Sequence, residues 1–84
     1  MAEVTIYVTP YCPYCIRARH LLEAKGAKYN MIDVSRDYAL RDEMERKSKR
    51  HTVPQIWIGK KHVGGCDDLM LLERSGELDN LLNA

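Results

Sequence analysis

The residues whose type and spacing fit a chemical reaction are Cys12 and Cys15, which enclose Pro13 and Tyr14. Thiol–disulfide exchange requires a thiolate that attacks a disulfide and a second thiol close enough to resolve the mixed disulfide. In a helix that begins here, Cys12 takes the N-cap position, where free N–H groups and the helix dipole lower the pKa of a thiol. Cys15 then lies one turn further along and is partly buried. The pair predicts Cys12 as an exposed nucleophile and Cys15 as the resolving thiol.

The same Cys-x-x-Cys spacing also forms half of many zinc sites. A complete site would need two further ligands from the remaining candidates, which are Cys66, His20, His51 and His62. These candidates do not include a second closely spaced pair, and His51 and His62 are too far apart in the sequence for a zinc-binding histidine pair. The sequence therefore predicts redox chemistry and no bound metal ion.

The flanking sequence predicts the elements that position the two cysteines. Apolar residues alternate with polar ones over residues 4–8, which indicates a largely buried strand, and Pro13 suits the first turn of a helix. Gly26 then provides a stop signal, and Ser35 is the expected N-cap of a second helix. The full prediction has strands at about 4–8, 28–34, 55–58 and 61–63, and helices at about 13–25, 36–49, 69–74 and 77–82, with Asp67 or Asp68 capping the third helix.

The order of these elements, β-α-β-α-β-β-α with a short helical tail, predicts an α/β domain. The first two strands and the helix between them form a parallel unit with a right-handed crossover. The last two strands are joined through Gly59 and Lys60, which fit a tight hairpin turn with glycine first. We therefore expect a mixed four-stranded sheet with helices on both faces, in a single domain over residues 1–84.

Composition limits the classes of partner and the location. The chain has 84 residues, 45% of them hydrophobic, and a formal net charge of +1, which predicts neither nucleic acid nor a membrane as a partner. The basic run at residues 46–51 has no interleaved aromatic residues and suits the C-terminal end of a helix. No membrane helix or signal peptide is indicated, and the three cysteines are not the even set of a secreted disulfide framework. We expect a cytoplasmic monomer.

Three motifs together carry a resemblance to a known family. They are Cys12-Pro13-Tyr14-Cys15 after a strand, Thr52-Val53-Pro54 before a strand, and Gly64-Gly65-Cys66-Asp67-Asp68 at the start of a helix. In this order and spacing they resemble the glutaredoxins, and the similarity extends over nearly the whole chain, as in the small bacterial members with two active-site thiols. The resemblance implies the thioredoxin fold, which agrees with the element order above. It also implies an oxidoreductase that uses glutathione as its reducing cosubstrate.

The resemblance assigns the central part of a glutathione site. Tyr14 would lean over the substrate beside the two cysteines. The segment Thr52-Val53-Pro54 would contain a cis-proline, and the backbone of Val53 would pair with the cysteine of glutathione. These residues would therefore hold the sulfur of glutathione beside Cys12.

The two ends of glutathione carry charges that need partners of their own. As in the family, Gly65, Cys66 and Asp67 are assigned to the γ-glutamyl end, because N–H groups at a helix start bind a carboxylate and an aspartate pairs with an ammonium group. The glycine carboxylate needs a cation, and many glutaredoxins have a lysine where this chain has Thr9. Arg41 is the predicted substitute, with Arg50 as the alternative.

The function implied is reduction of protein disulfides and of glutathione mixed disulfides, with no metal or organic prosthetic group. The partners would be glutathione and the proteins that carry these bonds. Three alternatives remain. The first is a thioredoxin-like reductant that a flavin reductase serves directly, and the second is an iron–sulfur cluster carrier whose homodimer bridges a cluster through Cys12 and glutathione. Pro13 argues against the carrier, because proline makes the helix start rigid. The third is a non-catalytic, redox-regulated binding module.

Overall fold

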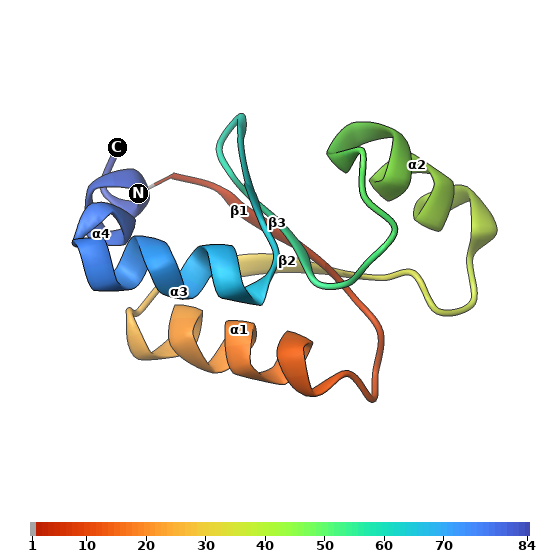
Figure 1. Ribbon diagram of the computed structural model, residues 1–84, viewed down its shortest axis with the longest axis horizontal. Helices are drawn as coiled ribbons and strands as arrows, with labels where there is room; N and C mark the ends of the chain where they lie inside the picture. Colours follow the sequence, from red (N-terminus) through yellow and green to blue (C-terminus); the bar gives the residue numbers. More distant parts are fainter. Residues whose placement is uncertain (1) are drawn as a thin grey trace.

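Strands and helices alternate along residues 2–84, which are the residues that the computed structural model describes (Figure 1). The predicted element order is confirmed, and the predicted bounds shift by a few residues. The elements are β1 (Val4–Val8), α1 (Pro13–Ala24), β2 (Tyr29–Asp33), α2 (Tyr38–Ser48), β3 (Gln55–Ile58), β4 (Lys61–Gly64), α3 (Cys66–Ser75) and α4 (Glu77–Leu82). No helix among them is long and apolar enough to span a lipid bilayer.

The four strands form one mixed sheet in the order β2-β1-β3-β4. β1 pairs in parallel with β2, whereas the β1–β3 and β3–β4 pairs are antiparallel. Gly59 occupies the first central position of the β3–β4 turn with a φ of +60°, a conformation that glycine adopts readily. The predicted mixed sheet and glycine-first hairpin are therefore confirmed.

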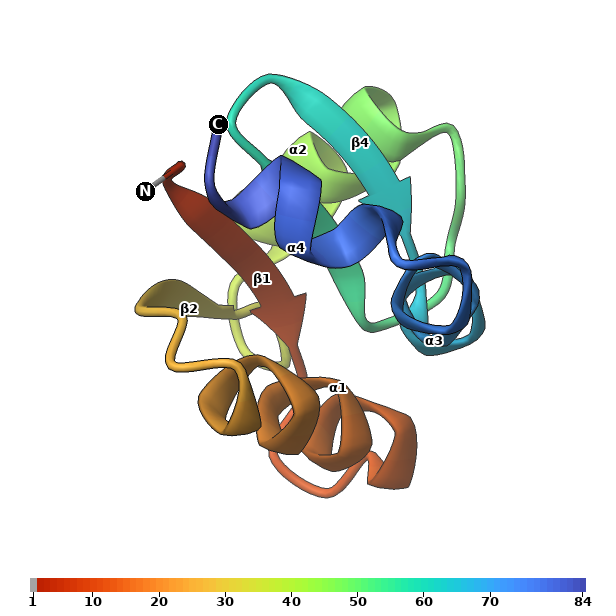
Figure 2. The ribbon, with the colours of Figure 1, turned by 90° about the vertical axis from the view of Figure 1, so that its left-hand side faces the viewer.

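Helices cover both faces of this sheet, as predicted. In β1, Val4, Ile6 and Val8 point into the larger apolar cluster, which α1, α3 and α4 complete. Tyr7 points to the other face and packs with Met44 of α2. Figure 1 shows α2 on the opposite side of the sheet from α1 and α3, and Figure 2 shows α4 crossing beside β1. The period-two alternation of β1 thus builds two cores from a single strand.

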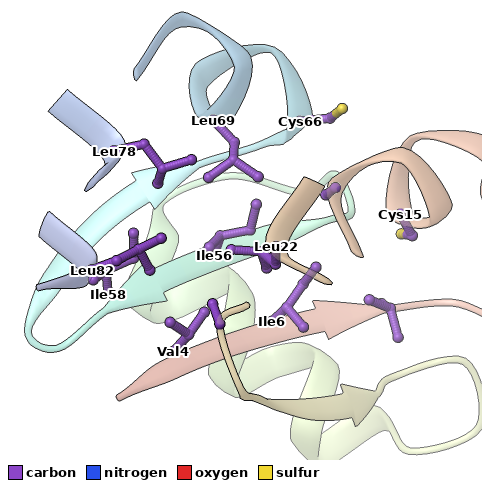
Figure 3. Packing of buried hydrophobic residues seen from close by; sticks show 13 residues of the cluster. Val4, Ile6, Cys15, Leu22, Ile56, Ile58, Cys66, Leu69, Leu78 and Leu82 are labelled. Atoms are coloured by element: carbon purple, nitrogen blue, oxygen red, sulfur yellow. The ribbon is translucent and has the colours of Figure 1, made fainter. Parts of the chain in front are cut away.

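The larger cluster extends from the chain ends to the predicted reactive thiols. Figure 3 shows Leu78 and Leu82 at one end of this cluster and Cys15 and Cys66 at the other. Leu69 is completely buried between these ends. The predicted reactive end of the domain therefore rests directly on the core, which fixes α1 and α3 relative to each other.

Two predicted helix caps were wrong. α2 begins later than expected, because the N–H of Ser35 donates to the Asp33 carboxylate at 2.8 Å and this short turn precedes the helix. Asp37 is the N-cap, since its Oδ1 accepts from the N–H groups of Ala39 and Leu40 at 3.0 and 3.1 Å. An aspartate that reaches two free N–H groups satisfies more of the helix start than Ser35 does.

α3 begins earlier than expected, at Cys66, and its N-cap is Gly65. Asp68 lies at the third helical position, and its Oδ2 accepts the N–H of Gly65 at 2.8 Å. Asp68 therefore closes the start of the helix from within, which is half of a capping box. Because Gly65 has no side chain, no cap oxygen occupies the N–H groups of the first turn.

The two candidate caps of α2 give a direct test of this fold. Asp37→Ala is expected to lower the free energy of unfolding by about 1 kcal/mol, because two N–H groups lose their acceptor. Ser35→Ala is expected to change it by less than about 0.5 kcal/mol. Urea unfolding of both variants measures the difference. An equal or larger loss in Ser35→Ala would contradict the observed helix start.

Candidate active site

Cys12 occupies the N-cap of α1, as predicted. Its backbone is extended, with φ −93° and ψ 114°, and Pro13 begins the helix directly after it. The sulfur of Cys12 accepts the N–H of Cys15 at 3.4 Å. Both cysteines are free thiols. The local sequence therefore presents a sulfur atom to unpaired helical N–H groups.

Cys15 lies one turn further along α1 and is only 1% exposed. Burial, together with a smaller contribution from the neighbouring Cys12, raises the pKa of its thiol to about 12. Cys12 is only half-buried. At neutral pH, Cys15 is therefore an uncharged thiol behind a more accessible one. This asymmetry agrees with the predicted order of nucleophile and resolving thiol.

The loop before β3 lies against the same sulfur. The Val53–Pro54 peptide bond is cis, as the resemblance implies. The thiol of Cys12 faces the carbonyl oxygen of Val53 at 3.8 Å. The loop therefore places backbone groups within reach of a molecule bonded to Cys12.

A cavity of about 280 Å³ opens beside this pair. Its size is at the lower end of the range for small-molecule sites. The walls come from α1, the loop before β3 and the start of α3, and they consist of Tyr14, Arg50, Thr52, Val53, Pro54, Gly65, Cys66, Asp67 and Asp68. The cavity thus brings together all the predicted glutathione-binding residues except Arg41. Their roles in binding stay predictions.

An ion pair joins two of the cavity walls, the loop before β3 and the start of α3. Arg50 Nη1 lies 2.8 Å from Asp68 Oδ2, which also accepts the N–H of Gly65. The hydrogen bond from Arg50, followed by that from Gly65, lowers the pKa of Asp68. Gly64 has a φ of +114°, and a side chain there would collide with the Asp68 carboxylate. Glycine at this position therefore permits the ion pair.

The role of Asp68 in this ion pair was not predicted from the sequence, in which Asp68 was one of two equivalent candidate caps for α3. One signal was available, since two adjacent residues on a helix point in directions about 100° apart, so only one of them can line the cavity fully. Asp67 is exposed and forms no ion pair with any residue between 2 and 84.

Arg41 lies outside the cavity beside Cys12. Its guanidinium donates to Glu45 at 3.1 Å and to the carbonyl of His51, one residue before Thr52. It lines a neighbouring hollow of about 730 Å³ together with Thr9 and Tyr38. The predicted cation and the residue that replaces the family lysine therefore share one hollow.

The described residues contain no group of three or more histidine, cysteine, aspartate or glutamate side chains that could hold a metal ion. Cys66 is buried at the start of α3, and burial raises the pKa of its thiol. It is therefore a neutral wall of the cavity at neutral pH. That the protein needs no metal stays a prediction.

Comparison with known proteins agrees with this geometry. The family named Glutaredoxin matches residues 4–63. The glutaredoxin of Pseudomonas aeruginosa is 56% identical over 84 residues, which cover 100% of both chains. The solution structure of Brucella melitensis glutaredoxin has 57% identity and a TM-score of 0.87, covering 98% of this chain and 89% of that one. A crystal structure of a buckwheat glutaredoxin–glutathione complex has 32% identity and a TM-score of 0.89, covering 95% and 76%.

The matched segment includes Cys12, Cys15 and the loop at Thr52–Pro54, and the TM-scores extend the likeness to α3 and α4. The thioredoxin fold that the family resemblance implies is therefore confirmed. The chain belongs to the glutaredoxin family and is a thiol–disulfide oxidoreductase.

Proposed function

We propose that this protein reduces protein disulfides and glutathione mixed disulfides with glutathione as reductant, using Cys12 as nucleophile and Cys15 as resolving thiol. The observation that carries the proposal is the cavity beside Cys12. Its walls contain the loop before β3 and the start of α3, which are assigned to the cysteine and the γ-glutamyl end of glutathione. The buckwheat relative in complex with glutathione supports the same ligand.

The γ-glutamyl end of glutathione fits the start of α3. Its carboxylate would accept the N–H groups of the first helical turn, which no side-chain cap occupies. Its ammonium would pair with Asp67, because Asp68 is already neutralised by Arg50. The two neighbouring aspartates would thus have different roles. Asp68 joins two walls of the cavity through Arg50, and Asp67 would bind the ligand.

The cysteine of glutathione would lie along the loop before β3. Val53 offers its N–H and its carbonyl there, and the carbonyl faces the Cys12 sulfur at 3.8 Å. Backbone pairing on this segment would place the glutathione sulfur next to Cys12. The glycine carboxylate would then extend toward His51 and the guanidinium of Arg41, which contacts the His51 carbonyl.

Reduction of a glutathione mixed disulfide would take two exchanges. The Cys12 thiolate attacks the glutathione sulfur, a new sulfur–sulfur bond forms, and the client protein leaves as a thiolate that takes up a proton. A free glutathione thiolate then attacks the glutathione sulfur bound to Cys12. Oxidised glutathione leaves and the Cys12 thiolate is restored. Each turnover consumes one free glutathione, and the other half of the oxidised glutathione comes from the mixed disulfide.

A protein disulfide would require both thiols. Cys12 attacks first and forms a mixed disulfide with the client protein. Cys15 then loses its proton, attacks the sulfur of Cys12 and releases the reduced client. Two glutathione molecules reopen the Cys12–Cys15 disulfide and leave as oxidised glutathione.

Asp67, the aspartate assigned to the ammonium group, provides a test of the proposed orientation of glutathione. Asp67→Asn should raise the KM for glutathione mixed disulfide about tenfold, since a charge-assisted contact is lost, with little change in the unfolding temperature. Asp79→Asn is the matched control, because it makes the same charge change on α4, where Asp79 pairs with Lys25. An unchanged KM in Asp67→Asn would contradict the assigned orientation.

Each alternative function predicts a different experimental result. Turnover with a thioredoxin reductase and none with glutathione would replace the proposal by a thioredoxin-like reductant. Visible absorbance after anaerobic reconstitution with iron and sulfide, lost in Cys12→Ser, would indicate a cluster carrier. A protein that catalyses no disulfide reduction, but binds a partner protein in only one redox state of its cysteines, would indicate a binding module. The identity of the client proteins, the monomeric state and the cytoplasmic location stay predictions.

A further inference from the structure

Gln55 is a polar side chain that is completely buried at the start of β3, directly after Pro54. Buried amides occur where all their polar atoms have partners. Its Nε2 donates to the carbonyl of Thr52 at 3.0 Å and to the Thr52 hydroxyl at 3.3 Å. Its Oε1 lies 2.8 Å from Nε2 of His62. A polar chain thus runs from β4, through the interior, to the loop beside Cys12.

The direction of each hydrogen bond in this chain follows from the Thr52 carbonyl. A carbonyl oxygen only accepts, so Gln55 must direct its amino group to Thr52 and its oxygen to His62. His62 must then donate from Nε2. Burial and, after it, the charge of Arg50 lower the pKa of His62, so its ring is neutral at pH 7 and has its proton on Nε2.

The position of the His62 ring is set by a second contact. His62 lies opposite Trp57 in the β3–β4 register, and the two ring centroids are 4.7 Å apart with 33° between the planes. This stacking leaves the ring edge with Nε2 directed at Gln55. The hairpin therefore supplies a fixed donor to a buried amide.

Anchoring the Thr52 carbonyl also sets the direction of the next N–H group. The Thr52–Val53 peptide is trans, so its carbonyl and the N–H of Val53 point in opposite directions. With the carbonyl directed at buried Gln55, the N–H of Val53 points away from the interior. Gln55 is not part of the cavity wall, whereas Thr52 and Val53 are.

We propose that Gln55 and His62 are positioning residues that hold the Thr52–Val53 peptide in the orientation in which Val53 pairs with the cysteine of glutathione. The inference rests on the proposed glutathione site and adds residues that do not touch the ligand. Without the two residues, the loop still carries the same backbone groups, but their direction is no longer fixed. Removing either residue is therefore expected to weaken the binding of glutathione and to leave the reactivity of Cys12 unchanged.

Two substitutions interrupt the hydrogen bonds that connect His62, Gln55 and Thr52, each at a different residue. Gln55→Met keeps the length of the side chain and removes the amide, and His62→Phe keeps the ring stacked on Trp57 and removes the donor. Each is expected to raise the KM for glutathione mixed disulfide about tenfold, the effect of one lost hydrogen bond of average strength or better. The kcat and the rate of Cys12 with a small aromatic disulfide are expected to stay within about twofold of wild type.

Conservative and stability-matched variants separate positioning from a purely structural role. His62→Gln restores an N–H donor near the position of Nε2 and is expected to return the KM toward the wild-type value. Leu82→Ala loses stability at the end of the larger cluster away from Cys15 and is expected to leave the KM unchanged. Should Gln55→Met fail to fold, His62→Phe on the half-buried strand β4 provides the test.

The outcomes of these measurements are distinct. A raised KM in His62→Phe, restored in His62→Gln and absent in Leu82→Ala, supports the inference. An unchanged KM in His62→Phe, an equal rise in His62→Gln, or an equal rise in Leu82→Ala overturns it. A wild-type protein that does not turn over with glutathione overturns the proposed function instead, so the two failures are distinguishable.

Discussion

Cys12→Ser is expected to abolish reduction of both protein disulfides and glutathione mixed disulfides, by at least about a thousandfold. Every exchange in the proposed cycle forms a bond to the sulfur of Cys12. A serine oxygen at this position cannot form a disulfide, and Cys15 cannot replace Cys12 because it is buried and its pKa is raised to about 12. Turnover of a chromogenic glutathione mixed disulfide with excess glutathione measures the loss.

The Cys12→Ser variant also contains its own control for folding. Serine is among the preferred N-cap residues, so its hydroxyl can accept the Cys15 N–H that the sulfur accepts in the native chain. The unfolding temperature is therefore expected to stay close to that of wild type. A folded Cys12→Ser variant with more than about a tenth of wild-type turnover would contradict the assignment of the nucleophile.

The elements around the thiols could be predicted because their signals are local. Alternating apolar residues in β1, Pro13 after Cys12 and Gly59 in the hairpin each constrain only a few neighbours. The N-cap position of Cys12 follows from such signals alone. The prediction of Cys12 as nucleophile and Cys15 as resolving thiol therefore rests on local signals and needs no tertiary contact.

The helix starts were harder because several short polar residues compete for one cap. Asp33, Ser35 and Asp37 lie within five positions, and the structure uses the first for a turn and the last for the cap. Which carboxylate reaches a free N–H depends on where β2 ends. Spacing in the sequence does not contain this information.

The contacts that shape the cavity join residues far apart in the chain. Arg50 and Asp68 are 18 positions apart, and Cys12 and Val53 are 41 apart. Sequence alone left Arg50 as an alternative cation for the ligand, whereas the structure uses it to neutralise Asp68. The sequence around Gln55 likewise gives no local signal that its buried side chain connects Thr52 to His62. Pairings of this kind follow from the topology of the sheet, so they appear only with the fold.

Cys15→Ser is expected to separate the two reactions. Reduction of a glutathione mixed disulfide needs only Cys12 and glutathione, so this activity is retained. Reduction of a protein disulfide is expected to fall by at least about a hundredfold, because an adjacent thiol is replaced by free glutathione. Parallel assays with a glutathione mixed disulfide and with a protein disulfide measure the separation. Equal losses in both assays would contradict the role of resolving thiol.

The electrostatics of Cys15 explain how a thiol with a raised pKa can still resolve the intermediate. Burial is the main cause of the raised pKa, but hydrogen bonding and charge at Cys12 add to it. In the mixed disulfide, Cys12 is bonded to the client protein and no longer has a titratable thiol, so these two contributions are removed. Cys15 is therefore more readily ionised in the mixed disulfide than in the free enzyme, which favours its attack on the Cys12 sulfur only after the first step.

The raised pKa of Cys15 also predicts how stability depends on pH. The folded state holds the Cys15 proton more tightly than the unfolded state, in which a cysteine titrates near pH 8.5. The stabilisation from the neutral thiol is complete below that pH and is lost as the pH rises toward about 12. Urea unfolding of the reduced proteins between about pH 7 and 10 is therefore expected to show a steeper alkaline loss in wild type than in Cys15→Ser. The buried thiol of Cys66 contributes equally to both proteins, so a parallel loss would show that the Cys15 proton is not held by burial.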